Sequence, residues 1–154
     1  DKKKEVFDKD IIALVDSEVS QKDELVKLIL LEVNCGSTRN PKVKVVLDFK
    51  GKKYEKVGSG NGPVDSIFKA INNVINNSAK LELFLINATT TGTDAQAEVS
   101  VRLSENGISV NGTSSDTDTM VASAKAYIIA LNKLIFKRMK KSSDINLLTK
   151  TLIK

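Results

Sequence analysis

Three glycines stand within five residues, Gly58, Gly60 and Gly62, and Pro63 follows them at the start of an apolar helical pattern. Glycines permit close backbone approach, and a helix that begins behind them presents free amide hydrogens to an anion such as a carboxylate or a phosphate. No Lys-Ser or Lys-Thr pair follows the glycines, so the pattern is not a nucleotide-binding P-loop. From the residues alone, a tight structural turn and a ligand-binding loop are both open.

Two acidic residues, Asp116 and Asp118, open a second apolar helical pattern. They could together hold a divalent cation, but acidic side chains at the start of a helix are most simply a cap and a partner for the helix dipole. We therefore interpret them as structural. The basic run from Lys137 to Lys141 is interpreted as a solvated helix face, where cations offset the negative end of the dipole, and phosphate binding is the alternative.

Histidine is absent from the 154 residues, and the only cysteine is Cys35. The usual zinc and haem ligand sets cannot be assembled from this composition, and neither can a Ser-His or Cys-His nucleophile pair. Lysine and carboxylate side chains could still act in catalysis. We expect a chain without a catalytic centre, a metal site or a cofactor of its own.

The charge of the chain is +5, from 24 Lys and Arg against 19 Asp and Glu, but both signs are interspersed and only 5% of residues are aromatic. A basic nucleic-acid-binding module is therefore an alternative and not the first interpretation. No run approaches the roughly 18 apolar residues of a membrane span, and the amino terminus lacks the apolar segment of a signal peptide. We expect a cytoplasmic location, no nucleic-acid or membrane partner and, because the first residue is not Met, a piece of a longer protein.

The elements around the glycines follow from hydrophobic periodicity. Residues 25–33 are apolar on both faces, residues 43–49 alternate cleanly, and a short turn leads into residues 54–57. Three antiparallel strands are therefore expected. After Pro63, apolar residues recur at the spacing of a helix until Asn76.

The same pattern occurs a second time. Residues 27–34 align with residues 80–87 at an offset of 53, and Gly58 aligns with Gly112 at an offset of 54. A second helix is expected from about Asp118 to Lys137. These units predict an α+β fold of internally duplicated βββα units with pseudo-twofold symmetry, in which antiparallel sheets pack against helices.

The repeats also predict how the chain is divided. We expect a helical linker at residues 1–24 and one domain at residues 25–154, with repeat 1 at about 25–78, repeat 2 at about 79–141 and a tail at 142–154 that adds a short terminal helix. Neither half carries enough apolar surface to fold alone. The helix stripes are wider than one copy obviously covers, so a homodimer is expected.

Three motifs in this order resemble a known family. They are Gly60-Asn61-Gly62-Pro63-Val64-Asp65, then Gly92-Thr93-Asp94-Ala95-Gln96-Ala97, then Asp116-Thr117-Asp118 followed by Ala122-Ser123-Ala124-Lys125-Ala126-Tyr127. Together they make the chain similar, over about residues 25 to 136, to the carboxy-terminal regulatory domain of 2-isopropylmalate synthase and of its relative citramalate synthase.

The resemblance implies a dimerising βββα duplication that binds the end-product amino acid at the subunit interface. The amino acid is leucine in isopropylmalate synthases and isoleucine in citramalate synthases, and we take leucine as the first interpretation. Binding there implies feedback inhibition of an acetyl-CoA-dependent condensation in a distant catalytic barrel, which holds a divalent metal. That barrel and its acyltransferase chemistry are absent from these residues.

By position, the resemblance assigns effector binding to the loop and helix start of repeat 1 and to the first two strands of repeat 2. The residues concerned are Gly60, Asn61, Gly62, Val64, Leu81, Phe84, Ala88, Ala95 and Ala97. The family often has Asp-Tyr where this chain has Leu83-Phe84, so a polar contact of the family is missing here. In this interpretation the loop amides take the effector's carboxylate, and the alanines leave room for a branched side chain.

Overall fold

Two antiparallel three-stranded sheets, each followed by a helix, make up the computed structural model, which describes residues 24–88 and 95–152. The α+β duplication of βββα units is confirmed. The predicted helical linker at 1–24 lies outside the described residues up to residue 23, and so do residues 89–94, which include the first three residues of the second motif. The elements are β1 (Val26–Gly36), β2 (Arg39–Phe49), β3 (Lys52–Ser59), α2 (Pro63–Val74), β4 (Lys80–Ala88), β5 (Ala97–Glu105), β6 (Ile108–Asp116) and α3 (Thr119–Leu152).

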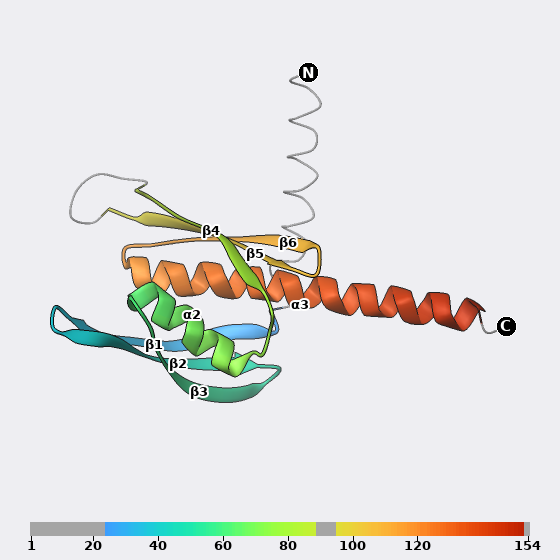
Figure 1. The fold of residues 1–154 in the computed structure, drawn as a ribbon, viewed down its shortest axis with the longest axis horizontal. Helices are drawn as coiled ribbons and strands as arrows, with labels where there is room; N and C mark the ends of the chain where they lie inside the picture. The colour runs from blue at the N-terminus through green and yellow to red at the C-terminus, as the bar shows by residue number, and fades with distance from the viewer. Residues whose placement is uncertain (1–23, 89–94, 153–154) are drawn as a thin grey trace, which may run out of the picture.

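The two helices lie between the two sheets, so the molecule has three layers (Figure 1). Helix α2 packs on β2 and β3 of its own repeat, and α3 packs on β5 and β6 of its own repeat. Helix α3 also contacts β1 of the other repeat. Alternate residues of the central strands point into this core, and they are Val43, Val45, Leu47, Val99, Val101 and Leu103, all fully buried.

The repeats match in detail. Both β2–β3 and β5–β6 are joined by two residues with positive φ, 54° and 83° at Lys50 and Gly51, and 50° and 79° at Asn106 and Gly107. These angles are those of the tight hairpin turns that suit twisted strands. A bulge interrupts β1 between Leu28 and Leu30, and another interrupts β4 between Leu81 and Leu83, which are the same positions of the two repeats.

Gly58 and Gly112 are also equivalent in the structure. A Cβ atom added at Gly58 would lie 2.5 Å from the backbone oxygen of Ser66 in α2, and one at Gly112 would lie 2.1 Å from that of Ala126 in α3. Such distances are too short for any side chain. Gly58 is therefore a packing residue of β3, where the helix crosses the strand closely, and not part of the ligand loop.

Helix α3 is longer than the sequence pattern predicts. It was expected to end near Lys137 and to be followed by a separate short helix, but one helix runs without a break to Leu152. No glycine or proline occurs within it, and the Ser143 hydroxyl donates to the Met139 carbonyl at 2.9 Å inside the helix. The run from Lys137 to Lys141 thus lies within the helix, and the predicted role at a helix end is wrong.

The segment Thr119–Asp144 of α3 is long and apolar enough to cross a membrane, with a mean hydropathy of 1.3 in its most apolar window. Most of that window is buried in the fold, against β5, β6 and β1. We assign it as the core helix of this domain.

Asn132 joins the two repeats. Its side-chain oxygen accepts from the Val26 backbone amide at 2.9 Å, and its side-chain nitrogen donates to the Val26 carbonyl at 2.9 Å. Asn132 and Val26 are both buried. The amide group of Asn132 thereby takes the place of a neighbouring strand at the beginning of β1 and fixes α3 across it.

Candidate functional site

The loop before α2 leaves the start of that helix open. Gly62 is the N-cap residue, and its dihedral angles are φ −161° and ψ 172°. It has no side chain to cap the helix, and Pro63 at the first helical position has no amide hydrogen. A Cβ atom at Gly62 would meet no atom within 4 Å, so the space in front of this residue is free.

The Asp65 side chain, in the first turn of α2, bonds back to the loop. One of its carboxylate oxygens accepts the Asn61 amide at 3.1 Å and forms an ion pair with Lys69 at 2.9 Å. These partners, Lys69 first, hold the pKa of Asp65 below its ordinary value. A Cβ atom at Gly60 would lie 2.1 Å from the same Asp65 oxygen, which explains the glycine.

The backbone amides that remain at the loop are those of the first helical turn. The Asn61 amide is taken by Asp65, and the Ser66 amide bonds the Gly62 carbonyl at 3.0 Å. Within the described part of the chain, the amides of Val64 and Asp65 have no acceptor. An oxyanion placed there would meet two donors and the positive end of the helix dipole.

The start of α3, unlike that of α2, is capped by a side chain, that of Asp118. The Asp118 carboxylate accepts the Met120 amide at 2.8 Å, and Asp116 accepts the Asp118 amide at 2.9 Å. That backbone hydrogen bond, together with Lys125, lowers the pKa of Asp116. The structural interpretation of the two acids as cap and helix partner is confirmed.

The predicted residues of β4 share the face of the strand that points toward the helix layer. Leu81, Phe84 and Ala88 pair with Leu103, Val101 and Ala97, the inward residues of β5. Yet Leu81 is 47% exposed and Ala88 is also exposed. Ile86, which lies on the same face and was not predicted, is 46% exposed. We call the residues Leu81, Phe84, Ile86 and Ala88 the β4 strip.

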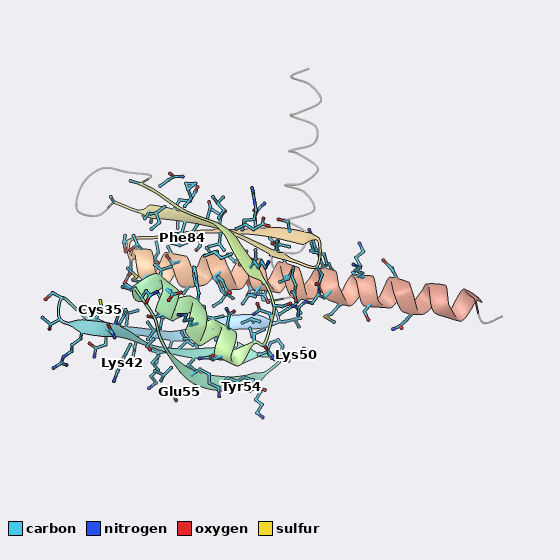
Figure 2. All side chains as sticks on the ribbon, viewed as in Figure 1. Cys35, Lys42, Lys50, Tyr54, Glu55 and Phe84 are labelled. Carbon is cyan, nitrogen blue, oxygen red and sulfur yellow. The ribbon has the colours of Figure 1, made fainter. Side chains whose placement is uncertain are left out.

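Phe84 is the half-buried member of the strip, on the side of β4 toward the helices (Figure 2). Its ring meets that of Phe68 edge to face, with 5.8 Å between centroids, and Phe68 stacks on Tyr127 at 4.3 Å. The Tyr127 hydroxyl donates to Asn72 at 2.7 Å, and burial raises the pKa of Tyr127. Three elements, β4, α2 and α3, are thus joined by aromatic contacts that no sequence pattern showed.

The structure brings some of the predicted residues together. Ala88 and Ala97 are cross-strand partners, and Ala95 is half-buried just before β5. Val64 is half-buried against the core at the open helix start, and Phe68, one turn later, contacts Phe84. Phe68 is therefore the link between the loop and the β4 strip.

None of the nine predicted residues lines any of four cavities found on the described residues, which belong to other parts of the surface. As far as residues 24–88 and 95–152 show, the predicted site is a surface and is not part of these four cavities. It combines two free amides at a helix start with uncovered apolar side chains. Such a surface can bind a small amphipathic molecule once another surface closes over it.

The comparison with protein families gives one match. The family described as "LeuA allosteric (dimerisation) domain" matches residues 5–135. The match includes the glycine loop, both sheets and most of the buried part of α3. It ends before the last part of α3, which runs on to Leu152.

Several curated proteins named 2-isopropylmalate synthase are similar to this chain. The one from Rhodopseudomonas palustris strain BisA53 is 49% identical over 140 residues, which are 91% of this chain and 27% of that protein. The one from Afipia carboxidovorans is 46% identical over 142 residues, or 92% of this chain and 27% of the relative. The one from Bradyrhizobium diazoefficiens is 46% identical over 140 residues. The chain therefore spans about a quarter of the length of these relatives.

Proposed function

Because the chain belongs to the family of LeuA allosteric (dimerisation) domains, and so represents a regulatory domain of the 2-isopropylmalate synthase family, we propose that two copies associate and bind leucine between them. Leucine would act as the feedback inhibitor of an acetyl-CoA-dependent condensation in the catalytic part of a longer protein. That part, and not this domain, would hold the divalent metal. The proposed location is the cytoplasm.

The observation that carries the proposal is the uncovered β4 strip. Leu81 and Ile86 are each almost half exposed although they lie on the inward face of their sheet, and Leu85 on the other face of β4 is 40% exposed. Among the strands of residues 24–88 and 95–152, β4 is also an edge strand, since only β5 pairs with it. An apolar edge of this kind is a liability unless another surface covers it. A second copy of the chain is the natural cover in a dimerisation domain.

Leucine fits the chemistry of this surface. Its carboxylate would accept the amides of Val64 and Asp65, and its ammonium group would lie near the Asp65 carboxylate. Its branched side chain would rest on the β4 strip, where Phe84 forms the floor. The family often has Tyr where this chain has Phe84, and the missing hydroxyl makes this floor more apolar than in the family pattern, which suits an aliphatic ligand.

The first test is a titration with leucine and, separately, isoleucine. Thermal unfolding and sedimentation equilibrium of the chain are followed together, because a ligand that binds only the folded dimer raises the unfolding midpoint and the fraction of dimer. At 100 times the dissociation constant the stabilisation is about 2.7 kcal/mol. Leucine is expected to act at lower concentration than isoleucine. The reverse order would identify the isoleucine-binding relative, and no shift with either amino acid would refute the proposal.

The loop is tested best at Gly62, since substitution at Gly60 would displace Asp65. Gly62→Asp places a carboxylate at the helix start, in open space and at a φ that any residue adopts, so it should abolish leucine binding while capping α2. Gly62→Ser is the matched control, because it caps the helix without a charge. Leucine binding that survives Gly62→Asp would place the effector elsewhere.

A further inference from the structure

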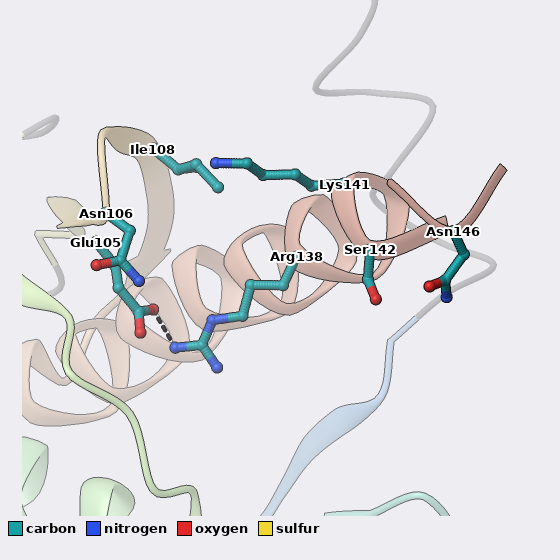
Figure 3. Close-up of a pocket in the computed structure, with 7 residues that line it drawn as sticks. All are labelled: Glu105, Asn106, Ile108, Arg138, Lys141, Ser142 and Asn146. Carbon is teal, nitrogen blue, oxygen red and sulfur yellow. Dashed lines mark hydrogen bonds and ion pairs between the residues drawn. The ribbon is translucent and has the colours of Figure 1, made fainter. Parts of the chain in front are cut away.

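A cavity of about 250 Å³ lies under the part of α3 that follows the family match (Figure 3). It is at the place where α3 leaves the turn between β5 and β6 and extends past the sheets (Figure 1). None of the residues that line this cavity belongs to the proposed leucine site. The lining residues are Glu105, Asn106, Ile108, Arg138, Lys141, Ser142 and Asn146.

An ion pair forms the wall of the cavity. The Glu105 side chain is only 7% exposed, and it accepts from the Arg138 guanidinium and from the Ser78 hydroxyl at 2.7 Å. These donors, Arg138 first, lower the pKa of Glu105. Because the buried carboxylate already has its partners, it holds Arg138 in place and leaves the cavity without an uncompensated negative charge.

The positive charge that remains in the cavity is that of Lys141. The lining has two cations and one carboxylate, and Lys141 has no ion-pair partner within the described ranges. Lys137 and Lys140 on the same helix are exposed and add to the positive potential, and Asp144 is the acidic residue nearest to them along the helix. The lining also includes the Ser142 hydroxyl and the side-chain amides of Asn106 and Asn146, which can all donate hydrogen bonds, while the Lys141 side chain extends toward Ile108 (Figure 3).

We propose that this cavity binds a small oxyanion, a phosphate or a carboxylate group. Lys141 supplies the charge, and Ser142, Asn106 and Asn146 supply neutral donors. Two of these donors lie on α3 and one lies on the β5–β6 turn, so a bound oxyanion would fasten the projecting part of α3 to the second sheet. The direction in which α3 leaves the domain would then depend on the ligand.

The test uses inorganic phosphate and acetate as probes on the full chain at constant ionic strength. Amide chemical shifts of Asn106, Ser142 and Asn146 are followed by NMR, and a saturable change with a dissociation constant on the order of millimolar is expected. Lys141→Gln should weaken binding by about tenfold or more, because the unpaired cation is lost. Lys137→Gln removes the same charge one turn away, outside the lining, and should leave binding unchanged.

Each outcome of this test has one meaning. Tighter binding of phosphate assigns the cavity to phosphate groups, and tighter binding of acetate assigns it to carboxylates. Shifts that rise without saturation, or that fall equally in Lys141→Gln and Lys137→Gln, show only general screening and overturn the proposal. Leucine binding is measured in the same variants and should not change, so failure here and failure of the proposed function remain distinguishable.

Discussion

The two repeats have the same plan but differ in what covers their first strand. In β1 the inward residues Leu28, Leu31 and Val33 are packed against the core, because α3 of the other repeat crosses the strand. In β4 the corresponding face keeps Leu81 and Ile86 almost half exposed. Helix α3 contacts β1 along the strand, whereas the described contact of α2 with β4 is that between the rings of Phe68 and Phe84. Duplication thus makes the fold, but the two helices cover the first strand of the other repeat to different extents.

The two repeats also differ in the contacts of two asparagines at corresponding positions of α2 and α3. Asn132 and Asn72 each follow by two residues the alanine that contacts the close-packed glycine, Ala130 or Ala70. Asn132 bonds β1 directly through both of its amide atoms. The Asn72 oxygen instead accepts from Tyr127 and from Asn77. Asn72 is therefore linked to the chain before β4 through Asn77 and not directly. The start of repeat 2 is held less directly than the start of repeat 1.

The largest effect is expected where the repeats are most alike. Gly112→Ala would place a Cβ atom 2.1 Å from a backbone oxygen of α3 that cannot move alone, and should lower the free energy of unfolding by about 3 kcal/mol or more. Gly58→Ala, at 2.5 Å, should cost somewhat less. Urea unfolding measures both, with Gly62→Ala as a control in open space. If Gly112→Ala unfolds like the control, the two glycines are not packing residues.

Sequence periodicity was sufficient for the duplication, because alternation in the strands and the offset of the glycines are local features. It did not give the role of Gly58, since the helix backbone that excludes a side chain there lies eight residues later and across the core. It missed Asp65, although its place in the first helical turn is typical of residues that bond back to the loop. Phe68 and Tyr127 are 59 residues apart, and only the folded chain brings them into contact.

The interpretation of the end of α3 failed for a different reason. The basic run from Lys137 to Lys141 was interpreted as a helix end, but these residues are compatible with a helix interior when nothing stronger interrupts it. Of the predicted site residues, those of β4 were placed on one face by the family resemblance. That this face is uncovered could not be predicted, because it depends on how the helices pack across the two repeats.

The second prediction tests whether β4, and not β1, forms the dimer interface. Ile86→Lys puts a charge on the uncovered β4 strip and should weaken the dimer by about 2 kcal/mol, since the ammonium group would lose water at the interface. Ile29→Lys is the matched control in β1, because Ile29 is also 46% exposed and should leave the dimer intact. Sedimentation equilibrium compares the two, and circular dichroism checks that both variants fold. Dissociation by Ile29→Lys alone would move the interface to β1.

The smallest effect concerns Glu105, whose counterpart in the first hairpin is Phe49: each residue pairs with the first position after its turn. The folded-state pKa of Glu105 is below its ordinary value of 4.5, so its contribution to stability is present above about pH 4.5 and is lost as the pH falls through the lower folded value. Glu105→Gln should cost about 1.5 kcal/mol at pH 7, because a charge-assisted bond to Arg138 is removed.

Urea unfolding of Glu105→Gln and of the unchanged chain from pH 7 to pH 3 would then give two curves that converge at the acidic end. Glu55→Gln is the control in the first repeat, since it breaks an exposed pair with Lys44 at 3.0 Å and should cost less than about 0.5 kcal/mol. Curves that stay parallel across this range would mean that Glu105 acts through its shape and not through its charge. The second hairpin would then hold α3 by packing alone.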